Sequence, residues 1–324
     1  MLASRTSLWQ RKAFRETGWF GISAGCELQN TRAKRTRMQS LKKYLSFVRF
    51  SHTVFSLPFA LASMAVACRE TRGWPGWRVF LLILAAMVCA RTTAMGFNRI
   101  VDRKFDAQNL RTAKRHLPAG QMSVIGAWWL VIGAAAGLLV VAWFINPICF
   151  WMSPSALIIV WLYSLTKRFT DFTHFFLGLA SAIAPVGAWL AVTGSFVWPP
   201  IVLAVAVVFW LTGFDIIYAT QDFAADKAAG LHSLPVRWGV AGSLRFARWA
   251  HVVMWMALVG FGLISGLRWA YFAGLAIIAV CLVYEHRLAR HSDPVSVNIA
   301  ALRVNGVISV VFLMAVIADV MTRY

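Results

Sequence analysis

Acidic side chains are scarce in this sequence, since Asp and Glu together account for only 12 of 324 residues. Charged residues of both signs make up 14% of the chain, and 60% of its residues are hydrophobic. A typical soluble domain has about 25% charged residues. The composition therefore excludes an ordinary soluble domain and indicates a chain that lipid surrounds over most of its length.

The sequence also lacks the spacing patterns of a zinc site. Its five cysteines show no paired spacing, and most of them lie inside apolar runs, where cysteine behaves as a small hydrophobic side chain. The seven histidines form no HxxxH or HExxH pattern. We therefore expect no zinc centre.

Residues 1–37 lack a long apolar stretch and are rich in Arg, Ser and Thr. Because a secretory signal needs an apolar core, this segment does not fit one. We interpret residues 1–37 as a basic, disordered N-terminal tail and residues 38–324 as the membrane domain. Our preferred hypothesis places the true start of translation at Met38.

Nine apolar runs are long enough to cross a bilayer as helices, which takes about 20 residues each. The runs cover residues 52–68, 78–97, 124–144, 147–165, 175–193, 200–220, 247–266, 269–285 and 299–320. Tryptophans lie near the ends of several runs, as an aromatic belt at the membrane surface requires: Trp74, Trp77, Trp128, Trp129, Trp198 and Trp269. The sequence thus predicts an all-α fold, an integral membrane bundle of nine or so transmembrane helices.

The basic residues are distributed unevenly between the two sides of this bundle. With the N-terminus in the cytoplasm, 26 of the 32 Lys and Arg residues fall in cytoplasmic segments or at their edges. The positive-inside rule then places the C-terminus on the opposite side. Topology therefore accounts for the net charge of +20 without a nucleic-acid partner. We expect a protein of the bacterial inner membrane with its polar site facing the cytoplasm.

Five of the 12 acidic residues fall in two clusters, each at the end of a long apolar run. In the first cluster, Asn98, Asp102 and Asp106 are four residues apart and form one stripe on a helix face. Asp222 and Asp226 repeat this step in the second cluster. Two facing stripes would surround a gap with oxygen ligands, through which Mg²⁺ could hold a diphosphate. Solvation of helix ends is the alternative, but it does not explain the repeated spacing.

Two further charges lie deeper in the predicted spans. Arg91 precedes Asn98 by seven residues, and Asp215 precedes Asp222 by seven, so each continues its stripe about 10 Å into the membrane. A charge at this depth needs a partner or a ligand. Two interpretations stay open: Arg91 and Asp215 pair with one another, or Arg91 binds the carboxylate of an acidic acceptor substrate.

Three segments resemble the signature motifs of the UbiA-type intramembrane prenyltransferases. They are Asn98–Asp106 with residues 109–120, Tyr163–Arg168 as a Tyr-x-x-x-Lys element, and Asp215–Asp226. The resemblance extends from about residue 49 to residue 323. One departure is Arg99, which stands where many members of the family have aspartate.

The resemblance implies that Mg²⁺ and an isoprenyl diphosphate bind at the two clusters. The residues expected to hold the metal–diphosphate complex are Asn98, Asp102, Asp106, Asp222 and Asp226. Lys167 and Arg115 would hold the leaving pyrophosphate, and Tyr163, Arg91 and Asp215 would complete the substrate site. We count Asp102, Asp106, Asp222, Asp226 and Lys167 as the catalytic set.

The acceptor that best suits Arg91 is a hydroxylated aromatic acid such as 4-hydroxybenzoate, prenylated on its ring during quinone biosynthesis. The resemblance also allows a naphthoate or another precursor of menaquinone. A function of a different class, a transporter with an intramembrane cation site, would use Arg91 and Asp215 as well. The sequence shows no convincing inverted repeat of the transporter kind.

Overall fold

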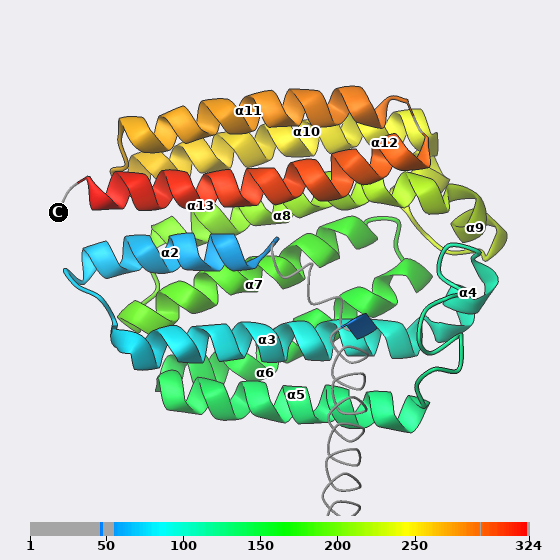
Figure 1. Ribbon diagram of the computed structural model, residues 1–324, viewed down its shortest axis with the longest axis horizontal. Helices are drawn as coiled ribbons and strands as arrows, with labels where there is room; N and C mark the ends of the chain where they lie inside the picture. The colour runs from blue at the N-terminus through cyan, green and yellow to red at the C-terminus, as the bar shows by residue number, and fades with distance from the viewer. Residues whose placement is uncertain (1–45, 48–54, 292, 323–324) are drawn as a thin grey trace, which may run out of the picture. The chain divides into compact units, whose positions relative to one another are not determined.

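The computed structural model describes residues 46–47, 55–291 and 293–322, and this part of the chain contains helices and no strand. Figure 1 shows the helices packed side by side. The predicted tail 1–37, the proposed start at Met38 and the beginning of the first predicted span lie outside the described residues. The assignment of the tail therefore stays a prediction.

Nine long helices correspond to the nine predicted spans. They are α2 (Leu57–Glu70), α3 (Gly76–Val101), α5 (Val124–Ile145), α6 (Pro147–Leu162), α7 (Thr173–Thr193), α8 (Trp198–Ala219), α10 (Leu234–Ile264), α11 (Trp269–Ala289) and α13 (Asn305–Met321). With their short extensions, eight of the described helices are long and apolar enough to cross a membrane. The prediction of an all-α integral membrane bundle is confirmed, and α2 is the described part of the first span.

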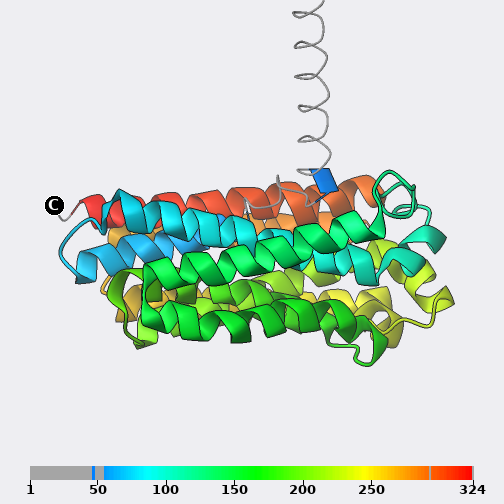
Figure 2. The ribbon, with the colours of Figure 1, turned by 90° about the horizontal axis from the view of Figure 1, so that it is seen from below.

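Short helical segments extend or connect these spans. They are α4 (Arg103–Gln108), the 3₁₀ helices η2 (Tyr163–Arg168) and η3 (Thr220–Asp222), α9 (Phe223–Ala228), α12 (Pro294–Asn298) and the π-helical η4 (Ile299–Val304). Of these, α4, α9 and α12 lie at the same end of the bundle (Figure 1). Figure 2 shows that the axes of the long helices are roughly aligned, so the connections gather at the two ends of the bundle.

The helix that carries the seventh predicted span begins before that span does, and a kink at Gly239 divides it. Helix α10 starts at Leu234, whereas the predicted span starts at residue 247. Ser233 caps the helix by accepting a hydrogen bond from the backbone N–H of Val236, and the chain bends at Gly239, where φ is +69°. Hydropathy missed this first part because Arg237 and Arg245 make it too polar for a membrane span.

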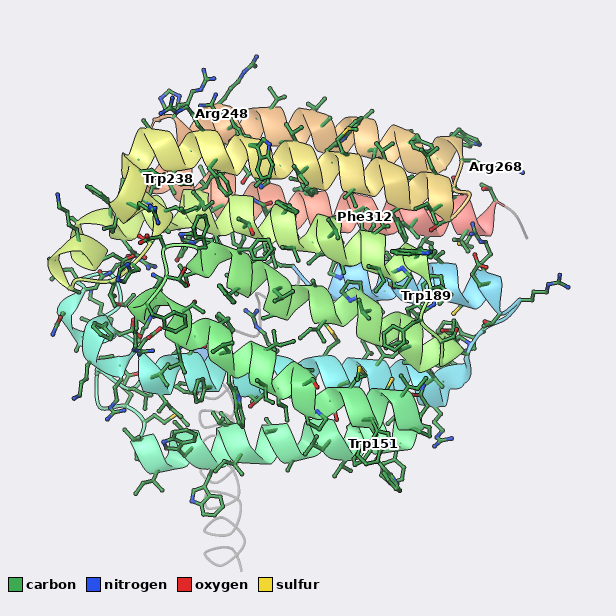
Figure 3. All side chains as sticks on the ribbon, turned by 180° about the vertical axis from the view of Figure 1, so that it is seen from behind. Trp151, Trp189, Trp238, Arg248, Arg268 and Phe312 are labelled. Carbon is green, nitrogen blue, oxygen red and sulfur yellow. The ribbon has the colours of Figure 1, made fainter. Side chains whose placement is uncertain are left out.

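The outer surface of the bundle is apolar, as a surface in contact with lipid should be. Trp198 and Trp269 are each 74% exposed, and Trp151 is 72% exposed. Trp189 is only 2% exposed, and Figure 3 shows it inside the bundle, whereas Trp151 lies near an outer helix. Trp198 and Trp269 belong to the aromatic belt that the sequence predicted, whereas Trp151 was not among its members.

Aromatic rings and small residues pack the interior. The ring of Phe59 on α2 lies 4.6 Å from that of Phe312 on α13 and 4.7 Å from that of Trp210 on α8, measured between centroids. Helices α7 and α8 approach closely at Gly178, where an added Cβ would meet the backbone of Val208. Small residues allow such close approach, which is how helices associate within lipid.

Buried polar groups are tied together next to the π-helical turn. The side-chain nitrogen of Asn305 lies 2.7 Å from Glu285 Oε1 and 3.2 Å from the carbonyl oxygens of Ala300 and Ala301. The Asn305 side-chain oxygen accepts a hydrogen bond from Trp210 Nε1 at 2.5 Å. Because lipid offers no partner for a backbone carbonyl, this network satisfies the π-turn and joins α8, α11 and α13.

The close approach at Gly178 predicts a selective loss of stability. We expect Gly178→Ala to destabilise the protein by about 1–3 kcal/mol, because the new methyl group overlaps the backbone of α8. The thermal unfolding midpoint in detergent measures this effect. Gly187→Ala on the same helix is the control, since its Cβ would meet nothing within 4 Å. Equal midpoints for the two variants would contradict the assignment of Gly178 to the α7–α8 contact.

Candidate active site

The predicted site residues line one cavity of about 370 Å³ at the end of the bundle that carries α4 and α9. The lining includes every predicted site residue. These residues are Arg91, Asn98, Asp102, Asp106, Arg115, Tyr163, Lys167, Asp215, Asp222 and Asp226. The structure therefore brings together all the residues that the sequence singled out. Their roles remain predictions.

The first acidic stripe is carried by two helices rather than by one. Helix α3 ends at Val101, and Asp102 links it to α4 with φ −89° and ψ 1°. The backbone N–H of Asp106 still donates to the carbonyl of Asp102 at 2.8 Å, so the side chains stay on one side. Asn98 Nδ2 donates to Asp102 Oδ2 at 2.9 Å and orients that carboxylate.

The second stripe has a similar break. Asp222 ends the short 3₁₀ helix η3 and precedes α9, which carries Asp226. The expectation of a single regular helix through each cluster was therefore wrong. The physical reason is that each chain segment leaves its transmembrane helix at the aspartate, where the span ends and the polar connection begins.

Each of the four cluster aspartates forms an ion pair with a basic side chain. The pairs and their nitrogen–oxygen distances are Asp102–Arg168 at 3.2 Å, Asp106–Arg115 at 2.7 Å, Asp222–Arg111 at 2.5 Å and Asp226–Lys167 at 3.3 Å. The aspartates are largely buried, and a buried carboxylate without a counter-charge is strongly unfavourable. The basic partners thus allow four acidic groups to share one cavity.

Two members of this arrangement were not identified from the sequence. Asn109 Nδ2 donates to Asp222 Oδ1 at 2.8 Å, and Arg111 Nε donates to the same oxygen at 2.9 Å. Arg111 also donates to the hydroxyl of Tyr218 at 2.8 Å. These contacts join the loop after α4 to the end of α8. Their partners are more than 100 residues apart in sequence, so only the first motif of the family resemblance could have drawn attention to them.

The pKa of Asp102 is shifted by its surroundings. Burial raises the pKa of Asp102 to about 6, although the nearby Arg168 and Lys167 act in the opposite direction. A carboxyl group with such a pKa loses its proton readily when a further cation approaches. Asp102 is therefore suited to respond to a cation that enters the cavity.

The deeper carboxylate has a partner that the sequence did not predict. His174 Nδ1 lies 2.7 Å from Asp215 Oδ2, and the histidine side chain is fully buried. The sequence suggested a pairing of Asp215 with Arg91 as one alternative. The contact with His174 supplies the counter-group that a carboxylate inside a span requires. No local pattern reveals it, because the two residues lie 41 positions apart.

A second, apolar cavity of about 420 Å³ adjoins the first. Its walls are formed mainly by aliphatic side chains of α3, α5, α6 and α7. The residues that line both cavities are Ser56, Arg91, Tyr163, Leu177 and Ser181. A compartment lined by acidic and basic side chains is therefore next to an apolar compartment, and Arg91 and Tyr163 belong to the wall of both.

The family model for the UbiA prenyltransferase family matches residues 56–312, most of the chain. The chain belongs to this family. As a UbiA prenyltransferase it is a membrane-bound transferase, and the alternative of a transporter is excluded. The match also covers the three motifs on which the sequence resemblance was based.

Relatives of known sequence and structure agree with this membership. The 4-hydroxybenzoate octaprenyltransferase of Vibrio parahaemolyticus is 29% identical over 259 residues, which cover 79% of this chain and 89% of the relative. That of Methylobacillus flagellatus is 28% identical over 282 residues, or 87% and 95% of the two chains. The apo structure of a UbiA homolog from Aeropyrum pernix K1 has a TM-score of 0.75 at 28% identity, covering 83% of this chain and 98% of its own.

A UbiA homolog from Archaeoglobus fulgidus, solved with DMAPP and Mg²⁺, has a TM-score of 0.62 at 25% identity and covers 86% of this chain. In the part of our UbiA prenyltransferase that the structure describes, no three Asp, Glu, His or Cys side chains form a metal site by themselves. Mg²⁺ takes oxygen ligands from carboxylates, amides, water and substrate phosphates. The donor pair of Asn98 and Asp102 has the required chemistry.

The contact between His174 and Asp215 predicts an asymmetric effect of mutation. We expect His174→Leu to destabilise this UbiA prenyltransferase by about 1–3 kcal/mol, because Asp215 loses its partner within the bundle. Chemical unfolding in detergent measures the change. His232→Leu is the matched control, since His232 pairs with Asp171 at 3.0 Å on the surface, where such pairs contribute little. An equal loss in both variants would contradict an interior role for the His174–Asp215 pair.

Proposed function

We propose that this enzyme transfers a polyprenyl group from an isoprenyl diphosphate to the ring of 4-hydroxybenzoate, in a Mg²⁺-dependent step of quinone biosynthesis. The observation that carries the proposal is that the charged cavity adjoins the apolar cavity and shares lining residues with it. A donor with a diphosphate at one end and a hydrocarbon chain at the other fits these two cavities, because the diphosphate suits the charged cavity and the chain suits the apolar one. The names of the similar octaprenyltransferases support the choice of acceptor.

The diphosphate binds in the charged cavity when basic side chains exchange their aspartate partners for its oxygens. Before binding, each cluster aspartate is neutralised by a basic side chain. A diphosphate would draw the basic side chains to its oxygens, and Asn98, Asp102, Asp106, Asp222 and Asp226 would then be free to hold Mg²⁺. Bound there, Mg²⁺ supplies positive charge that stabilises the leaving pyrophosphate. The cavity thus keeps its charge balance with and without substrate.

Lys167 and Arg115 act on the leaving group. Both line the charged cavity and already contact carboxylates of the clusters at 3.3 and 2.7 Å. When the bond between the first prenyl carbon and the diphosphate oxygen breaks, negative charge collects on the pyrophosphate. Positioned cations stabilise that charge without reorganising, which lowers the barrier to ionisation.

The apolar cavity holds the prenyl chain and keeps water away from the cation that forms. Water would otherwise capture the allylic cation and give a prenyl alcohol instead of the product. Few polar groups line this cavity, and those it shares with the charged one include Tyr163 and Ser181. The reacting carbon is therefore expected near Tyr163, where the two compartments meet.

Arg91 at this junction binds the carboxylate of the acceptor. The ring then faces the prenyl cation, a carbon–carbon bond forms, and the ring carbon releases its proton to restore aromaticity. Asp215 lines the same cavity and is held by His174 at 2.7 Å, so it is positioned to take this proton. The charged end of the bundle faces the cytoplasm of a bacterial inner membrane, in agreement with the distribution of Lys and Arg.

Removing one cluster carboxylate should abolish the reaction without unfolding the protein. We expect Asp102→Asn or Asp222→Asn to lower prenyl transfer by about 100-fold or more, because the metal–diphosphate complex loses a charged ligand. Product formation from labelled donor and 4-hydroxybenzoate measures this. Asp171→Asn is the control, since Asp171 pairs with Arg237 at 2.9 Å and does not line the cavity. Turnover close to that of the wild type in either cluster variant would disprove the metal assignment.

Arg91 should affect the binding of the acceptor and leave the binding of the donor diphosphate unchanged. For Arg91→Ala we expect the KM for 4-hydroxybenzoate to rise about 10- to 100-fold, since a charge-assisted hydrogen bond contributes about 1.5–3 kcal/mol. The KM for the donor diphosphate should stay the same. Steady-state kinetics with each substrate varied in turn separate the two. A naphthoate acceptor in place of 4-hydroxybenzoate tests the choice of aromatic acid, and an unchanged acceptor KM in a folded variant would refute the role of Arg91.

A further inference from the structure

A second basic cavity lies on the outer face of the bundle, between the neighbouring helices α10 and α11. It has a volume of about 550 Å³ and shares no lining residue with the charged cavity of the active site. Arg248 of α10 and Arg287 and Arg290 of α11 line it. Figure 3 shows Arg248 at the outer edge of the bundle, away from the layer that contains α5 and α6. We call this cavity the α10–α11 groove.

The groove has a basic end and an apolar end. On α10, Arg248, Val252 and Trp255 follow one another at steps of four and three residues, and so share one face of the helix. Ala279 and Val283 of α11 lead along the same groove to Arg287 at steps of four. At 1.5 Å per residue the stripe on α11 from Ala279 to Arg287 is about 12 Å long. A ligand that fills the groove therefore has an anionic group at one end and an apolar part next to it.

The three arginines of the groove have no acidic counterpart. Among the described residues, none of Arg248, Arg287 and Arg290 takes part in an ion pair. No acidic side chain lines the groove either. In the active site, by contrast, each cluster aspartate has its own basic partner. Positive charge at the groove is therefore available to a ligand.

The floor of the groove is polar and well ordered by hydrogen bonds. His251 is only 2% exposed, and its Nδ1 lies 3.0 Å from His286 Nε2. Its Nε2 lies 3.2 Å from the carbonyl oxygen of Trp210. Both histidines line the groove, so the arginines surround a fixed polar base.

The position of the groove indicates which phase its ligand comes from. Val252 and Val283 are 61% and 53% exposed on the outer face, where the bundle meets lipid. The arginines lie where the predicted spans 247–266 and 269–285 begin and end, at the level of the lipid headgroups. The positive-inside rule explains basic residues at this level. It does not explain why three of them, from two helices, surround a cavity with an apolar extension.

We propose that the α10–α11 groove binds one anionic phospholipid, with its phosphate between Arg248, Arg287 and Arg290. An acyl chain lies along Val252 and Trp255. Basic cavities between transmembrane helices on the cytoplasmic side are suited to anionic headgroups, because charge and apolar contact act together there. A soluble phosphate would supply only the first of these two contributions.

Native mass spectrometry of the purified full chain, with phosphatidylglycerol or phosphatidylcholine added, tests the proposal. We expect the wild type to retain one phosphatidylglycerol in preference to phosphatidylcholine. Arg248→Gln/Arg287→Gln should weaken this binding about 25-fold, since one arginine near a lipid surface contributes about fivefold in affinity. The matched control is Lys104→Gln/Arg303→Gln, which removes two exposed charges that do not line the groove. Its binding should equal that of the wild type.

A second variant separates occupancy from net charge. Ala279→Trp fills the apolar part of the groove, keeps every charge and should also lose the lipid. Prenyl transfer measured in parallel shows that each variant is folded. Equal retention of phosphatidylglycerol by all variants would overturn the proposal. It would equally fail if inorganic phosphate alone displaced the lipid, or if the arginine variants changed only self-association of the chain.

Discussion

Charge pairing at one end of the bundle is the interaction on which the site depends. Four aspartates approach each other closely enough to line one cavity, and each is neutralised by a basic side chain from η2 or from the loop after α4. Repulsion among four unpaired carboxylates would push the ends of α3 and α8 apart. The same pairs thus hold the helix ends in place and preserve a set of groups that can exchange partners when a diphosphate binds.

The interior of the bundle follows a different principle. Hydrophobic burial cannot drive helices together within lipid, so contact depends on close packing and on satisfied polar groups. Gly178 permits the approach of α7 to α8, and Asn305 donates to buried carbonyl oxygens of the π-turn. They position the helices that carry the clusters, and in this way the packing of the spans sets the geometry of the cavity.

The sequence predicted the features that depend on neighbouring residues and missed those that depend on contacts between distant segments. Spans such as 124–144 depend on local hydropathy and were placed almost to the residue, because lipid imposes a length and a composition on every helix. The clusters at Asp102 and Asp222 were recognised for the same reason, as rare charges at helix ends. The early start of α10 was missed, since its first turns carry arginines and depend on capping by Ser233. The contact of His174 with Asp215 depends on how α7 packs against α8, which no local pattern records.

The junction between the two cavities has a consequence for substrate tolerance. If the proposed donor binds with its diphosphate among the polar groups, its first carbon takes the same position in the protein whatever the number of isoprene units behind it. The far end of the chain meets aliphatic walls that are indifferent to its identity and limited only in room. Chain length and reaction chemistry are therefore governed by separate parts of the molecule. Evolution can change one by substituting small residues such as Ala184 along α7, and leave the other untouched.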